Sequence, residues 1–197
     1  MRVLGAVLAG GRSCRFGSDK ALALYAGRTL LDHAVHAIGA QADAVIVCGR
    51  AIDGLCCVDD RPRPGLGPLG GLNAALAYGG AWGFDAVCSI GCDTPMLPDG
   101  LVRRLMAQGC PAVVTDLPVI GLWPVTLAAR LDRFLEESDD CSVRRWARIC
   151  GAAALSLDST IPNINRSEDL EHLIGLRGSS AGTIDPRPLS GAAPGFR

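Results

Sequence analysis

A glycine-rich segment near the start of the chain, LAGGRSCRFGSDK, combines the residue types that bind polyphosphates. It covers residues 8–20 and follows the apolar run 3–7, which has the composition of a buried strand. Glycines let backbone N–H groups approach phosphate oxygens closely, and the side chains of Arg15 and Lys20 can neutralise phosphate charge. The alternative is a tight connection that binds nothing. We interpret the segment as the phosphate-binding part of a nucleotide-handling enzyme.

Two commoner kinds of glycine-rich loop, the Walker loop and the dinucleotide loop, do not fit this sequence. A Walker loop requires GxxxxGK followed by Ser or Thr, whereas Gly11 and Gly17 enclose five residues and two more separate Gly17 from Lys20. The letters GLGPLG at 65–70 match a dinucleotide loop, but they follow a proline-rich stretch rather than the first strand. The sequence therefore excludes an ordinary P-loop and disfavours a Rossmann dinucleotide loop.

A second candidate site is Asp93, which follows the apolar run Ala86–Ile90 in the sequence GCDTP. Mg²⁺ keeps several waters and binds one or two carboxylates together with phosphates, so an aspartate at the end of a buried strand suits it. The alternative is an Asx turn before Pro95. Because the same chain carries a phosphate-binding segment, we favour Mg²⁺ binding by Asp93.

Asp60 and Asn165 are further candidates whose roles stay open. The carboxylate of Asp60 could accept hydrogen bonds from the N1–H and N2–H₂ edge of guanine, or it could be a solvated loop carboxylate. Asn165 and Glu168 have the spacing of a helix N-cap box, which would cap the last helix. The sequence shows no Ser/His/Asp arrangement for nucleophilic catalysis, whereas in-line nucleotidyl transfer needs only positioned phosphates, Mg²⁺ and cations.

The elements that must position these residues alternate between strands and helices. Apolar runs predict strands over 3–8, 44–47, 86–90, 112–114 and 153–157, and helical spacing predicts helices over 29–38, with Thr29 as N-cap, 72–78, 99–107, 125–137 and 143–149. This rhythm predicts an α/β fold: a single doubly wound domain over 1–175, with a mainly parallel sheet and helices on both faces. Ligands bind beyond the carboxyl ends of such strands, so the glycine-rich segment and Asp93 should share one crevice. Residues 176–197 lack periodicity and predict a disordered tail.

Composition restricts the partners and the compartment. The formal net charge is −1, so nothing indicates nucleic acid or an anionic membrane as a partner. The apolar runs are far shorter than the ~20 residues of a membrane span. The nine cysteines are odd in number and form no CxxC pair, which suits neither a disulfide framework nor a zinc site. We expect reduced cysteines in a cytoplasmic protein.

Five motifs occur in an order that resembles the molybdenum cofactor guanylyltransferases. They are LAGGRSCRFGSDKAL at 8–22, GRTL at 27–30, GPLGGLNAAL at 67–76, CDTPMLP at 92–98 and NINRSEDL at 163–170. The resemblance covers about residues 3–175 and implies a Rossmann-like nucleotidyltransferase fold. It implies transfer of GMP from GTP to the terminal phosphate of Mo-molybdopterin, with release of pyrophosphate and with Mg²⁺ as cofactor. A monomer would contact molybdopterin-supplying or molybdoenzyme-maturation proteins transiently.

The resemblance also implies roles for individual residues. Leu8, Ala9, Gly10 and Gly11 would contact GTP, Lys20 would bind its phosphates with help from Arg15, Asp60 would read guanine, and Asp93 would hold Mg²⁺. This chain departs from the family at Cys48, where some members place an Asn, and at Leu117-Pro118, where relatives often carry His-Pro. The alternatives are a cytidylyltransferase or other nucleotidyltransferase of the same chemistry, and a non-catalytic nucleotide- or molybdopterin-binding protein of the same fold.

Overall fold

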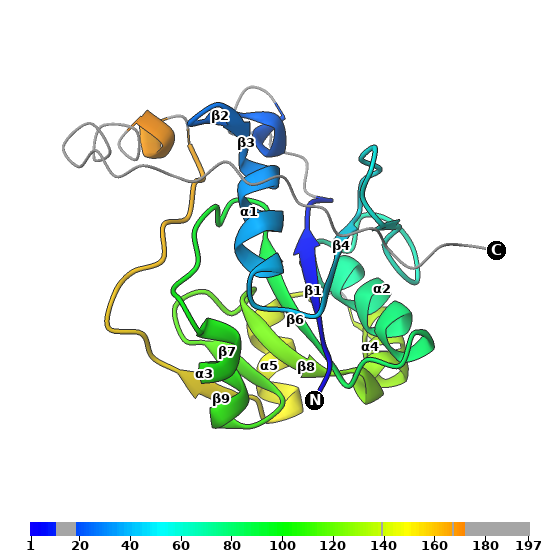
Figure 1. Ribbon diagram of the computed structural model, residues 1–197. Helices are drawn as coiled ribbons and strands as arrows, with labels where there is room; N and C mark the ends of the chain where they lie inside the picture. Colours follow the sequence, from blue (N-terminus) through cyan, green and yellow to red (C-terminus); the bar gives the residue numbers. More distant parts are fainter. Residues whose placement is uncertain (11–18, 139, 167, 172–197) are drawn as a thin grey trace.

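The molecule is built around a seven-stranded sheet (Figure 1). The structure is a computed structural model, and it describes residues 1–10, 19–138, 140–166 and 168–171. Its strands are β1 Val3–Leu8, β4 Ala44–Cys48, β5 Cys57–Val58, β6 Ala86–Gly91, β7 Ala112–Val114, β8 Gly121–Pro124 and β9 Ala153–Leu155. They lie in the order β5-β4-β1-β6-β8-β7-β9, and within this described sheet β8 alone runs antiparallel to its neighbours. A separate hairpin pairs β2 Leu24–Tyr25 with β3 Arg28–Thr29.

Helices cover both faces of the sheet. They are α1 Leu30–Gly39, α2 Pro68–Ala81, α3 Leu101–Gln108, α4 Ala128–Glu137 and α5 Val143–Cys150, with short 3-10 turns η1 Lys20–Leu22 and η2 Val125–Leu127. Successive residues of a strand point to opposite faces. Val7 of β1 accordingly packs in one core with α1 and α3, and Ala6 packs in the other with α2, α4 and α5. The predicted doubly wound, mainly parallel α/β fold is confirmed.

Element boundaries differ from the sequence prediction where local signals are weak. Helix α1 begins with a capping box between Thr29 and Asp32, as the Thr29 N-cap predicts. Helix α2 begins at Pro68, earlier than the predicted start at Leu72, because proline is favoured in the first turn of a helix. Strand β8 is not predicted, since it is short and bounded by glycine and proline. The predicted helix 125–137 begins as the separate turn η2 before α4.

The topology opens a crevice at the carboxyl edge of the sheet. Leu8, the last residue of β1, pairs with Cys48 of β4 on one side and with Gly91 of β6 on the other. The connection from β1 to β4 runs through α1 on one face, whereas the connection from β5 to β6 runs through α2 on the opposite face. Such a change of face is where ligands bind in doubly wound sheets.

The cysteines of the described residues behave as small apolar side chains. All eight are free thiols, and Cys48 and Cys88 are fully buried. Burial raises the pKa of the Cys88 thiol to about 12, which keeps it protonated at neutral pH.

No helix in the described ranges is long and apolar enough to cross a membrane. The predicted tail, 176–197, lies outside the described residues.

Candidate functional site

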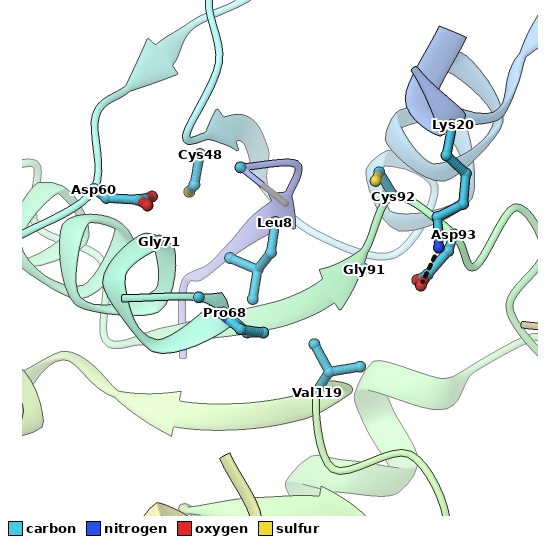
Figure 2. A pocket seen from close by; sticks show the side chains of 12 residues that line it. Leu8, Lys20, Cys48, Asp60, Pro68, Gly71, Gly91, Cys92, Asp93 and Val119 are labelled. Carbon is cyan, nitrogen blue, oxygen red and sulfur yellow. Dashed lines mark hydrogen bonds and ion pairs between the residues drawn. The ribbon is translucent and has the colours of Figure 1, made fainter. Parts of the chain in front are cut away.

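A pocket of about 320 Å³ opens at the carboxyl edge of the sheet, beside the ends of β1, β4 and β6 (Figure 2). Its lining residues come from segments far apart in the sequence: Leu8, Gly10, Lys20, Cys48, Asp60, Gly67, Pro68, Gly71, Gly91, Cys92, Asp93 and Val119. Figure 2 shows Asp60 at one end and Lys20 with Asp93 at the other, with Leu8 between them. The pocket therefore has a carboxylate end and an end where both charges are present.

Glycine backbone surrounds the carboxylate of Asp60. A Cβ added at Gly10 would lie 3.4 Å and 3.5 Å from the two carboxylate oxygens, and one added at Gly49 would lie 3.0 Å from Oδ1. A Cβ added at Gly70 would lie 3.1 Å from Cβ of Asp60. Glycine at these positions lets the backbone approach Asp60 closely, and a larger side chain at any of them would press on Asp60 or on its glycine neighbours.

The surroundings of Asp60 favour a ligand that donates hydrogen bonds. Desolvation raises the pKa of the Asp60 carboxyl above its ordinary value, the charge of Asp59 raises this pKa further, and the backbone of Gly65 partly lowers it. A half-buried carboxylate loses water contacts, which N–H donors of a ligand can replace. Asp60 is therefore suited to bind a group with adjacent N–H donors.

Lys20 and Asp93 form an ion pair at the other end of the pocket. The ammonium group of Lys20 donates to Oδ2 of Asp93 over 3.0 Å, and the two side chains are only 14% and 23% exposed. The partial burial reduces solvent screening of this attraction. Asp93 follows β6 in a turn in which the N–H of Thr94 donates to the carbonyl of Gly91 over 3.2 Å. Pro95 lacks the N–H that would close an Asx turn on Asp93, so that alternative reading of the carboxylate does not hold.

Asn165 joins this end of the pocket from the last described segment of the chain. Its Oδ1 accepts a second hydrogen bond from the ammonium group of Lys20 over 3.4 Å. The structure differs from the expected cap box with Glu168, because the carboxylate that accepts from the N–H of Asn165 belongs to Asp169, at 2.8 Å. The capping carboxylate thus comes from Asp169, while the side chain of Asn165 contacts Lys20.

The structure gathers most of the predicted site residues around one pocket. The predicted residues that line it are Leu8, Gly10, Lys20, Asp60 and Asp93. Ala9 lies behind the wall, 2% exposed, where its N–H donates to the carbonyl of Cys48 over 2.9 Å. Gly11 and Arg15 lie outside the described residues. The expectation that the glycine-rich segment and Asp93 share one crevice is met by Gly10, Lys20 and Asp93.

Two further lining residues, Pro68 and Val119, had no individual role in the sequence analysis. Pro68 lies in the motif GPLGGLNAAL, and Val119 directly follows the departure at Leu117-Pro118. Gly67, with φ +61°, precedes Pro68 at the start of α2, so the Gly-Pro pair is a signal for a helix that begins at the pocket. Val119 lies in the turn between β7 and β8, where the N–H of Ile120 donates to the carbonyl of Leu117 over 2.8 Å. No local signal identifies Val119. It lies at the pocket because β8, which it precedes, runs antiparallel beside β6.

Asp93 suits a divalent cation that is shared with phosphate oxygens. Within the described ranges, no group of three or more His, Cys, Asp or Glu residues could hold a metal ion by itself. Mg²⁺ is commonly bound by one or two carboxylates together with substrate phosphates and water. The partly exposed carboxylate of Asp93 provides one ligand of that set in the pocket, and the phosphates and water would provide the others.

Gly49→Ala is expected to lower the free energy of unfolding by about 2–4 kcal/mol. Gly49 has φ +80°, and an added Cβ would lie 2.6 Å from Cα of Gly10. Gly54→Ala is the matched control, because Gly54 has φ +78° and nothing lies within 4 Å of an added Cβ. Its loss should be limited to backbone strain, about 1 kcal/mol. Urea denaturation measures both losses, and equal values would contradict a close packing of Gly49 on Gly10.

Comparison with known proteins points to one group. The family model for the MobA-like NTP transferase domain matches residues 5–154. The molybdenum cofactor guanylyltransferase of Rhodobacter capsulatus is 37% identical over an alignment of 184 residues that covers 86% of this chain and 94% of that relative. The match to the family model contains every lining residue of the pocket described above, since these residues lie between Leu8 and Val119.

Solved structures share the fold. Molybdopterin-guanine dinucleotide biosynthesis protein A from Archaeoglobus fulgidus superposes with a TM-score of 0.69 at 17% identity, covering 89% of this chain and 99% of that one. The complex of Rv0371c from Mycobacterium tuberculosis H37Rv with manganese superposes with a TM-score of 0.62 at 18% identity, covering 89% and 99%. At these identities the two likenesses establish the architecture alone.

Proposed function

Because this chain belongs to the molybdenum cofactor guanylyltransferase family, we propose that it transfers GMP from GTP to the terminal phosphate of Mo-molybdopterin. The products are the guanine dinucleotide form of the cofactor and pyrophosphate. One observation carries the proposal: Asp60 lies at one end of a single pocket, and Lys20 with Asp93 lies at the other. That arrangement offers a carboxylate to a base and an ammonium group to a triphosphate.

The transfer forms one phosphorus–oxygen bond and breaks another. An oxygen of the terminal phosphate of Mo-molybdopterin attacks the α-phosphorus of GTP. The bond from that phosphorus to the α–β bridging oxygen then breaks, and pyrophosphate leaves with the electron pair. The attacking oxygen is already ionised at neutral pH, so the pocket needs no general base.

The residues of the pocket hold the reacting groups and neutralise charge. Lys20 donates to the phosphates and stabilises the charge that develops on pyrophosphate, and Asp93 would hold Mg²⁺ together with the triphosphate. Mg²⁺, when bound, supplies further charge neutralisation. Asp60 accepts from the N1–H and N2–H₂ groups of guanine. Leu8 and Gly10, which line the pocket, would contact the nucleotide, and the buried Ala9 would support them from behind the wall. Gly11 would add a further contact to the nucleotide, and Arg15 would add a second cation.

We also propose a cytoplasmic monomer that contacts molybdopterin-supplying or molybdoenzyme-maturation proteins transiently. The free thiols of the described cysteines suit a reducing compartment. GTP and Mo-molybdopterin are then the small-molecule partners.

The test of the function compares nucleotides directly. Pyrophosphate release should require GTP, Mg²⁺ and Mo-molybdopterin together. Release with CTP but not with GTP would replace the guanylyl assignment by a cytidylyl one. GTP binding without any release would instead indicate a non-catalytic protein of this fold.

Asp60→Asn is expected to lower kcat/KM for GTP about 10- to 100-fold, since a hydrogen bond to a charged group contributes roughly 1.5–3 kcal/mol. The amide presents an N–H₂ group where the carboxylate presents a second acceptor oxygen. Steady-state kinetics with GTP measure the loss. Asp59→Asn removes the same charge from the exposed neighbouring residue and should leave kcat/KM within about twofold. Equal effects of both variants would contradict a role of Asp60 in base recognition.

The pH dependence gives an independent check on Asp60. The ionised carboxylate is the form that accepts hydrogen bonds from guanine. Because the pKa of Asp60 is raised above the ordinary 3.8, acidification should weaken GTP binding at a higher pH than an exposed aspartate would predict. This part of the pH profile should disappear in Asp60→Asn, which has no titrating group at that position.

A further inference from the structure

A single dipeptide, Gly49-Arg50, contacts both residues that border the segment 11–18 in the sequence. Gly49 packs against Gly10, where an added Cβ would lie 2.6 Å from Cα and 2.9 Å from N of Gly10. Arg50 reaches Asp19 on the other side of that segment. Both contacts start from the carboxyl end of β4, the strand next to β1. The two residues that directly follow β4 therefore contact both Gly10 and Asp19.

The contact between Arg50 and Asp19 is bidentate. Nη1 of Arg50 lies 2.7 Å from Oδ2 of Asp19, and Nη2 donates to Oδ1 over 3.0 Å. The side chain of Arg50 is 20% exposed and that of Asp19 is 40% exposed. Paired guanidinium–carboxylate hydrogen bonds fix orientation as well as distance. Arg50 also holds the pKa of the Asp19 carboxyl below its ordinary value, so Asp19 stays ionised at neutral pH.

Asp19 passes this constraint to Lys20. Its Oδ1 also accepts from the N–H of Ala21 over 3.2 Å, which makes Asp19 the N-cap of the turn η1. Lys20 is the first residue of that turn, and its ammonium group lies 3.0 Å from Oδ2 of Asp93. The backbone of Lys20 is thus fixed by Asp19, and the position of Asp19 is fixed by Arg50.

We propose that Arg50 is a positioning residue that acts through Asp19 to hold the ammonium group of Lys20 where the nucleotide's phosphates bind. Both Nη atoms of Arg50 contact Asp19, so the guanidinium acts on the protein rather than on the phosphates. The proposal rests on the proposed function only for the identity of the ligand. The chain Arg50–Asp19–Lys20 is a statement about the protein itself.

The chain offers a direct probe, since Lys20 is its only lysine. Incorporation of [¹³C,¹⁵N]lysine into the full chain labels one side chain, and NMR then reports the Lys20 side chain without overlap. Arg50→Ala and Asp19→Asn should each shift this signal, and the double variant should shift it no further. Asp19→Asn keeps an Oδ1 acceptor for the N–H of Ala21, so it removes the charge without removing the cap.

Enzymatic activity provides a second test of the same two single variants and their double variant. Arg50→Ala and Asp19→Asn should each lower kcat/KM for GTP about tenfold, and the double variant should lose no more than either single variant. Arg50→Lys should recover part of the loss, because an ammonium group makes one of the two contacts. Arg145→Ala, which removes an ion pair with Asp140 at 3.4 Å on the far helix α5, is the control and should leave both readouts unchanged.

Two results would overturn the proposal. An unshifted Lys20 signal in Arg50→Ala would show that Arg50 does not act on Lys20. A further loss of about tenfold when Arg50→Ala is added to Asp19→Asn would show that Arg50 acts on the ligand directly. If the wild-type protein transferred no GMP, the function proposed above would fail, and the NMR arm would still decide the role of Arg50.

Discussion

Asp93→Ala is expected to reduce turnover by 10²-fold or more, which corresponds to about 2.7 kcal/mol of transition-state stabilisation. The carboxylate of Asp93 is the group that would hold Mg²⁺ against the triphosphate, and in the described structure it pairs with Lys20 over 3.0 Å. Its removal takes away the metal ligand and leaves the ammonium group of Lys20 without this partner. Pyrophosphate release under saturating GTP and Mo-molybdopterin measures the effect.

Two variants separate chemistry from folding at this position. Asp93→Asn keeps the shape of the side chain and the backbone carbonyl that accepts from the N–H of Ile164 over 2.9 Å. It should melt close to the wild-type temperature and still lose most activity. Asp99→Ala removes an exposed carboxylate from the same loop and should remain active. A folded Asp93→Asn protein with near-wild-type turnover would rule out a metal-binding role for Asp93.

Lys20→Ala is expected to reduce turnover by a similar factor, 10²-fold or more. The side chain of Lys20 is only 14% exposed, and its ammonium group contacts both Asp93 and Asn165 in the pocket, so its charge acts where water is partly excluded. If Lys20 stabilises the departing pyrophosphate, kcat should fall as well as kcat/KM. Stopped assays of pyrophosphate at varied GTP measure both constants.

A matched variant tests whether the position of the charge matters. Arg63→Ala removes the same unit of positive charge from an exposed loop near Asp60 and should change kcat/KM by less than about twofold. Lys20→Arg keeps the charge but changes the reach and shape of the donor, so it should recover only part of the activity. Similar losses in Lys20→Ala and Arg63→Ala would mean that overall charge, and not Lys20, governs turnover.

The parts of the site that could be predicted from sequence depend on strand ends. Gly10 and Asp93 each follow an apolar run, and parallel strands bring their carboxyl ends to one edge, so their meeting required no knowledge of side-chain packing. The seven-stranded order itself was beyond local reasoning, because β5 has two residues and β8 is bounded by glycine and proline. Short elements are specified by their neighbours in the sheet rather than by their own propensity.

The contacts between distant side chains could not be predicted in this way. Arg50 has no sequence signal that points to Asp19, and the two residues meet only because β4 lies beside β1 in the sheet. Asn165 and Glu168 have the spacing of a cap box. In the structure the capping carboxylate is that of Asp169, and the side chain of Asn165 contacts Lys20 instead. Local patterns therefore located the charged groups, while the tertiary structure determined their partners.

The ion pair between Lys20 and Asp93 bears on the order in which ligands add. Each group already has a counter-charge, so a bare nucleotide would have to draw the ammonium group away from the carboxylate, and a bare cation would face the opposite difficulty. A nucleotide that arrives with its cation offers phosphates to one partner and a metal to the other at the same moment. The resting pair would then be exchanged rather than broken, so we expect the metal–nucleotide complex to be the kinetic substrate.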